Sequence, residues 1–98
     1  MRFTHKEASS IKEAFQDVFQ EGTILLFGSR VDDNKKGGDI DLYIQLSHPL
    51  SPREQLERKA QFKLKLYEAL GEQKIDIVIA KDQQRSIEKS ALKTGVPL

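Results

Sequence analysis

The sequence contains no cysteine among its 98 residues, which excludes disulfide bonds and thiolate metal sites. It also has no excess of charge of either sign, because 16 basic and 15 acidic residues leave a formal net charge of +1. A protein that binds long nucleic acids needs a basic surface to neutralise phosphates. We therefore do not expect a nucleic-acid partner.

Long apolar runs and the common glycine motifs of nucleotide-binding proteins are absent as well. No run is long enough to span a membrane, and residues 1–6 lack the apolar core of a signal peptide. Neither Gly-x-x-x-x-Gly-Lys nor Gly-x-Gly-x-x-Gly occurs, so a P-loop or dinucleotide-binding domain is not indicated. We expect residues 1–98 to form a single soluble, cytoplasmic domain with a modest core.

Apolar residues at helical spacing predict three helices, near residues 5–20, 51–70 and 83–94. The last of these is expected to be capped by Asp82. The apolar side of the first helix comprises Ala8, Ile11, Ala14, Phe15, Val18 and Phe19, and that of the last comprises Ile87, Ala91 and Leu92.

The helix predicted over 51–70 has a strong start, with Ser51 as the N-cap, Pro52 in the first turn and Glu54 at the third position. Its apolar arc is wider than covering one small sheet requires. The arc comprises Leu56, Ala60, Leu64, Tyr67 and Leu70, and it is widened by Phe62, Leu66 and Ala69. Two interpretations remain open: the extra residues form a self-association or partner surface, or the first helix packs on them.

Short apolar segments between the helices predict three strands, over Thr23–Phe27, Asp39–Leu46 and Lys74–Ala80. The tail Val96–Leu98 can add a short fourth strand. The expected fold class is therefore α/β (α+β), with a small mixed sheet of three to four strands flanked by helices.

The most informative segment joins the first predicted strand to the second. Gly28 permits a sharp turn, Ser29 can cap a following helix, and backbone N–H groups at such a turn favour a phosphate. Nine residues separate Ser29 from Asp39, and Asp41 follows on the same face of the strand. Two carboxylates held side by side repel unless a cation joins them. Magnesium is the natural candidate, because it prefers oxygen ligands and substrate phosphates.

A third aspartate, Asp76, interrupts the aliphatic strand predicted over 74–80. If the second and third strands are neighbours, Asp76 can join Asp39 and Asp41. If it is buried, it needs a partner or a metal, because an unpaired buried carboxylate is costly. The alternative is that Asp76 pairs with a lysine such as Lys74, while Asp39 ends a turn and Asp41 lies on a solvated face. Aspartate is disfavoured in strands, which weakens that alternative.

Taken together, Phe27-Gly28-Ser29-Arg30, Asp39-Ile40-Asp41-Leu42 and Ile75-Asp76-Ile77-Val78 resemble the signature of the DNA polymerase β-like nucleotidyltransferase superfamily. The short chain looks like the minimal nucleotidyltransferase (MNT) group. Members of that group are small proteins, often encoded beside a HEPN-domain protein as a toxin–antitoxin pair. The resemblance implies a palm-like nucleotidyltransferase fold.

The resemblance also implies a reaction and a set of site residues. The implied reaction is transfer of a nucleoside monophosphate, AMP from ATP, to a hydroxyl with two Mg²⁺ ions as cofactors. The implied catalytic and metal-binding residues are Asp39, Asp41 and Asp76. The implied nucleotide-binding residues are Gly28, Ser29 and Arg30. The resemblance does not decide the acceptor, which can be a hydroxyl on a HEPN toxin, a small molecule or an RNA end.

A second hypothesis keeps the fold but not the catalysis. In it the chain is an antitoxin that neutralises a partner protein by contact. Under either hypothesis, a homo-oligomer or a different second chain can complete the nucleotide pocket. Substituting Asp39 and Asp41 separates the two, because an enzyme loses its function whereas a contact antitoxin still binds.

Overall fold

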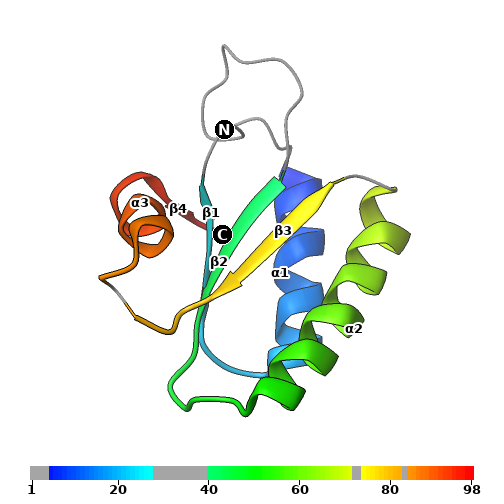
Figure 1. The fold of residues 1–98 in the computed structure, drawn as a ribbon. Helices are drawn as coiled ribbons and strands as arrows, with labels where there is room; N and C mark the ends of the chain where they lie inside the picture. The colour runs from blue at the N-terminus through cyan, green and yellow to red at the C-terminus, as the bar shows by residue number, and fades with distance from the viewer. Residues whose placement is uncertain (1–4, 28–39, 72–73, 83) are drawn as a thin grey trace.

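The computed structural model describes residues 5–27, 40–71, 74–82 and 84–98 (Figure 1). The elements in chain order are α1 (His5–Phe19), β1 (Thr23–Phe27), β2 (Ile40–Gln45), α2 (Pro52–Leu70), β3 (Ile75–Ile79), α3 (Ser86–Thr94) and β4 (Val96–Pro97). Each predicted helix and strand is present, and the tail supplies the short fourth strand.

The strands form one mixed sheet in the order β3-β2-β1-β4. β1 is antiparallel to both of its neighbours, β2 and β4, whereas β2 and β3 are parallel. Parallel neighbours need a long connection, and α2 provides it between β2 and β3. The expected α/β class and mixed sheet are confirmed.

The main core lies between the sheet and the layer formed by α1 and α2, which cover one face (Figure 1). Alternate residues of each strand point into it, as Ile40, Leu42 and Ile44 do from β2. Three phenylalanine rings join the two helices. Phe62 of α2 lies edge-on to Phe19 at a centroid distance of 5.8 Å, and Phe15 lies 5.5 Å from Phe19. Aromatic pairs at such distances add to the stabilisation that burial provides.

The buried face of α2 is narrower than the predicted arc. Phe62 and Leu66 are fully buried, whereas Leu56 is 73% exposed and Leu64 is 62% exposed. α1 therefore packs on one side of the arc, as the second of the two interpretations expects. The two exposed leucines remain outside that contact.

The opposite face of the sheet carries a smaller core under α3, built from Phe27, Tyr43 and Ala91. Ile87 and Leu92 were expected to face it, and that prediction is wrong, because they are 42% and 40% exposed. The buried residues of α3 are Glu88 and Ala91. A carboxylate thus lies on the buried side of α3, and the apolar pattern did not predict it there.

The predicted capping role of Asp82 is also wrong. The N-cap residue of α3 is Arg85, which makes no side-chain capping bond. Asp82 instead accepts a hydrogen bond from the backbone N–H of Gln84 at 2.9 Å. Such a local turn uses the aspartate before the helix begins.

The start of α2 supports a stability prediction. Ser51 Oγ accepts the backbone N–H of Glu54 at 3.2 Å, and the Glu54 carboxylate accepts the backbone N–H of Ser51 at 3.3 Å. Ser51→Ala is expected to lower the free energy of unfolding by about 1 kcal/mol, because it removes this capping box. Chemical denaturation measures the change. Ser90→Ala, at an exposed position within α3, is the control, and an equal loss in both variants would contradict the prediction.

Candidate functional site

Asp41 of β2 and Asp76 of β3 occupy opposite positions in the register of the two parallel strands. Neighbouring strands lie about 4.8 Å apart, so the two side chains leave the same face as neighbours. Asp41 is half-buried and Asp76 is exposed. The sequence predicted this adjacency on condition that the second and third strands are neighbours, and they are.

Asp76 is exposed, so the condition under which it would need a partner or a metal, burial of its carboxylate, is not met. β3 is the outermost strand on its side of the sheet, and the small core under α3 does not include Asp76. The exposure of this carboxylate gives a substrate access to it. Because Asp76 is exposed, its carboxylate does not require a partner for stability. The argument that it has a role in the site therefore rests on its position opposite Asp41.

The pair lies at the end of the sheet where β1 stops and β2 starts. Phe27, the last residue of β1, is paired with Asp41 in the antiparallel register. Gly28 is the next residue in the chain after Phe27. The predicted site residues Gly28, Ser29, Arg30 and Asp39 lie outside the described residues, so their assignments stay predictions.

The donor set of the pair suits a hard cation. Both side chains offer only carboxylate oxygens, and Mg²⁺ is commonly held by one or two protein carboxylates together with substrate phosphates. Within the described ranges, no group of three or more His, Cys, Asp or Glu side chains could hold a metal ion. Asp41 and Asp76 are thus two candidate ligands, and Asp39 is the predicted third.

A comparison with protein-family models matches residues 9–98 to the model described as Polymerase beta, Nucleotidyltransferase. This match covers most of the chain. The chain belongs to the polymerase β nucleotidyltransferase family. A comparison with curated proteins finds no match. Nucleotidyl transfer, a transferase activity, is the general function of this family, and the fold agrees with it.

On the same face of the sheet as the carboxylate pair of this nucleotidyltransferase lies a buried hydrogen-bond network that the sequence did not predict. Tyr43 is two residues beyond Asp41 on the same face of β2, and it is fully buried. Its hydroxyl donates to Glu88 Oε1 at 2.8 Å. The network therefore joins the strand that carries Asp41 to α3.

Glu88 is fully buried, yet its carboxylate accepts several hydrogen bonds. Besides Tyr43, its donors are the backbone N–H of Lys81 at 3.1 Å, the backbone N–H of Asp82 at 2.8 Å and the Arg85 guanidinium at 3.3 Å. Burial raises the pKa of the Glu88 carboxyl, but these donors outweigh burial and hold the pKa below its ordinary value. Burial, followed by the hydrogen bond to Glu88, raises the pKa of Tyr43 to about 12.

One sequence signal could have revealed Glu88. It stands three residues after Arg85, a spacing at which helix side chains meet, and the Arg85 guanidinium does donate to its carboxylate. It also stands three residues before the buried Ala91, on the same side of the helix. A glutamate with both spacings indicates a buried carboxylate that accepts hydrogen bonds from the turn before the helix.

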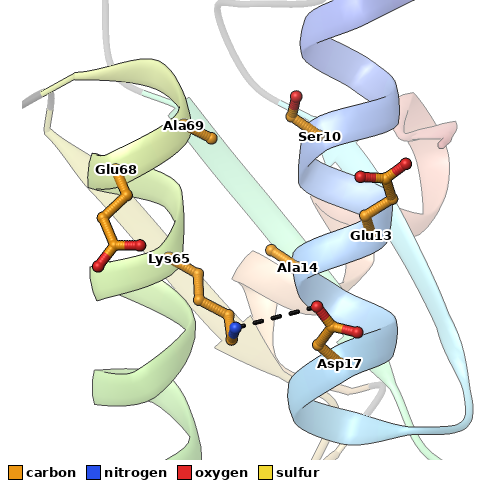
Figure 2. Close-up of a pocket in the computed structure, with 7 residues that line it drawn as sticks. All are labelled: Ser10, Glu13, Ala14, Asp17, Lys65, Glu68 and Ala69. Atoms are coloured by element: carbon orange, nitrogen blue, oxygen red, sulfur yellow. Dashed lines mark ion pairs between the residues drawn. The ribbon is translucent and has the colours of Figure 1, made fainter.

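The hollow between α1 and α2 is not part of this site. Figure 2 shows its lining, in which the Lys65 ammonium lies 3.9 Å from the Asp17 carboxylate, with Glu13 and Glu68 nearby. It belongs to the helical layer, whereas the Asp41–Asp76 pair leaves the other face of the sheet. Exposed ion pairs of this kind contribute little to stability.

None of the helices in the described part of the chain is long and apolar enough to cross a membrane.

Proposed function

We propose that this nucleotidyltransferase transfers AMP from ATP to a hydroxyl acceptor, in a reaction that depends on Mg²⁺ and takes place in the cytoplasm. The observation that carries the proposal is the register of Asp41 opposite Asp76 on one face of the sheet. Two adjacent carboxylates repel each other, so their placement favours a bound cation between them and the substrate. The family match supports nucleotidyl transfer as the reaction class.

The side chains have distinct roles under this proposal. Asp39, Asp41 and Asp76 hold two Mg²⁺ ions, and Asp76, which is exposed, can accept the proton of the attacking hydroxyl. When bound, the ions neutralise charge on the transferring phosphate and activate the attacking oxygen. Gly28, Ser29 and Arg30 bind the triphosphate. Because phosphoryl-type transfer needs no covalent help from the protein, positioning and charge suffice for the chemistry.

The acceptor is expected to approach from the open edge of the sheet, where Asp76 is exposed. A hydroxyl on a partner protein, such as a HEPN-domain toxin, fits this access. An RNA end fits less well, because the net charge of +1 gives little attraction for a long phosphate backbone.

Calorimetric titration of ATP with Mg²⁺ tests the proposed site directly. The chain should bind MgATP, and the Asp41→Asn/Asp76→Asn variant should bind at least roughly tenfold more weakly, a loss of about 1.4 kcal/mol. Asp17→Asn, an exposed carboxylate of the helical layer, is the matched control and should bind like the unaltered chain. Equal affinity in all three would refute the site. A lack of MgATP binding in the unaltered chain would favour an antitoxin that acts by contact.

A further inference from the structure

A groove runs between α2 and the outer side of β3, next to the carboxylate pair. Its lining comes from one side of α2 and from the start of β3, and comprises Leu56, Lys59, Ala60, Lys63, Asp76 and Ile77. The four α2 residues share one side of the helix because they are spaced three and four residues apart. The groove therefore brings two lysines to the same surface as Asp76, a carboxylate of the proposed site.

The two lysines of the groove have no partner for their charges. Lys59 and Lys63 are half-buried, although lysine is mostly exposed in folded proteins. In the part of the chain that the structure describes, neither ammonium forms an ion pair, whereas Lys65, two residues beyond Lys63, pairs with Asp17. A half-buried lysine lays its apolar stem along the surface and keeps its charge accessible. Both charges are therefore available to an anion that enters the groove.

The groove lies on the acceptor side of the carboxylate pair. β1 and β3 flank β2 on opposite sides. The predicted triphosphate-binding residues follow Phe27, the last residue of β1, whereas the groove borders β3. We therefore expect Lys59 and Lys63 to lie beside the acceptor and away from the triphosphate.

The shape of the groove suits an extended peptide. β3 is the outermost strand on its side of the sheet, and an extended peptide can align with such an open edge. Lys59 and Lys63 are four residues apart, which is about 6 Å along the helix axis. Alternate side chains of an extended peptide lie about 7 Å apart on one side. Two acidic side chains with one residue between them therefore match the spacing of the two lysines.

We propose that this groove binds an extended acidic peptide segment that carries the acceptor hydroxyl, and that Lys59 and Lys63 pair with its carboxylates. The inference rests on the proposed AMP transfer and names the class of acceptor. The acceptor oxygen bonds to the α-phosphorus of ATP, pyrophosphate leaves with the electron pair of the broken P–O bond, and the hydroxyl proton passes to Asp76. The two lysines also offset the repulsion between Asp76 and the acidic segment.

Binding of labelled peptides to the full chain, followed by fluorescence anisotropy, tests the groove without any turnover. Three peptides of equal length carry the same serine and tyrosine hydroxyls, flanked by glutamates, by glutamines or by lysines. The unaltered chain should bind the glutamate peptide roughly tenfold more tightly than the glutamine peptide, the size expected of two exposed ion pairs acting together. Lys59→Glu/Lys63→Glu should reverse the preference in favour of the lysine peptide.

Lys89→Glu/Lys93→Glu is the matched control. It changes the net charge equally, and its lysines are also four residues apart, at exposed positions of α3. This control should keep the preference of the unaltered chain. Equal binding of the three peptides to the unaltered chain, or the same loss in both variants, would overturn the proposal. Stronger binding of a single-stranded oligonucleotide than of the glutamate peptide would assign the lysines to phosphates and overturn it as well.

Two further measurements separate the acceptor groove from the proposed reaction. Calorimetry should show equal MgATP binding in Lys59→Glu/Lys63→Glu and in the unaltered chain, and a loss there would place the lysines at the triphosphate and contradict the acceptor assignment. With ATP labelled at its α-phosphate, the unaltered chain should label the glutamate peptide, and Lys59→Glu/Lys63→Glu should label it roughly tenfold less. Peptide binding without labelling by the unaltered chain would contradict the transfer reaction and leave the groove as an acidic-peptide site.

Discussion

Asp41→Asn is expected to reduce nucleotidyl transfer by roughly 10²–10³-fold, the range seen when one preorganised group that stabilises developing charge is removed. Asparagine has nearly the shape of aspartate, so the strand register that places residue 41 opposite Asp76 should persist. What is lost is a negative charge that a cation and the substrate phosphates require. Pyrophosphate release from MgATP measures the rate, with a cell extract supplying acceptor hydroxyls and the extract alone as the blank.

The effect should be specific to the pair. Asp76→Asn is expected to give a similar loss, and the double variant should lose little more than either single one, because residues that act as a unit are not additive. Asp17→Asn, far from the pair on α1, should retain the full rate. If Asp41→Asn kept the unaltered rate while folding normally, the assignment of the carboxylate pair would be wrong.

Glu88→Ala is expected to lower the free energy of unfolding by about 2–4 kcal/mol. The substitution leaves the buried Tyr43 hydroxyl and the partly buried backbone N–H groups of Lys81 and Asp82 without their acceptor. It also opens a cavity under α3. Such a loss is a large share of the stability of a small domain, about 5–15 kcal/mol. Denaturant unfolding at neutral pH measures it, and Glu13→Ala, an exposed glutamate of α1, serves as the control. If Glu88→Ala and Glu13→Ala changed the free energy of unfolding equally, the stabilising role of the Glu88 hydrogen bonds would be contradicted.

The same carboxylate gives a pH dependence whose sign follows from its lowered pKa. A group with a lowered pKa in the fold stabilises the protein above its ordinary pKa, 4.5 for this carboxyl, and the stabilisation is lost as the pH falls through the folded value. The unaltered chain should therefore exceed Glu88→Gln in stability at neutral pH, and the difference should shrink on acidification below about 4.5. A difference that stays constant over this range would show that the charge of Glu88 does not contribute.

The sequence predicted the elements well because apolar spacing reports directly on burial. β1 spans Thr23–Phe27 as predicted, β2 ends one residue before the predicted end, and β3 is one residue shorter at both ends than the predicted strand. The adjacency of Asp41 and Asp76 was also predictable, on the condition that the strands joined by α2 pair with each other. A helix between two strands favours such a parallel pair.

The exposure of Asp76 depends on the order of strands in the sheet. Alternation within β3 separates Asp76 from Ile75 and Ile77, but it does not show that β3 is the outermost strand. The position of α3 over β1 and Tyr43, rather than over Asp76, is likewise decided by tertiary packing and not by spacing along the sequence.

The buried faces of the helices were predicted less well for a related reason. Periodicity treats every leucine as a core residue and every glutamate as a surface residue. In the structure Leu56 and Leu64 are exposed, whereas Glu88 is buried because nearby backbone N–H groups satisfy its carboxylate. The docking of each helix, which spacing alone does not fix, decides between these outcomes.

We propose that Asp41 and Asp76 hold a divalent cation, and the most direct test is to locate that cation on the chain. Adding a small fraction of Mn²⁺ with ATP to the ¹⁵N-labelled protein broadens the amide signals of residues near the ion. We expect selective broadening around Asp41 and Asp76, absent in the Asp41→Asn/Asp76→Asn variant. Broadening centred elsewhere, for example on Glu13 and Asp17 of α1, or unchanged in that variant, would contradict it.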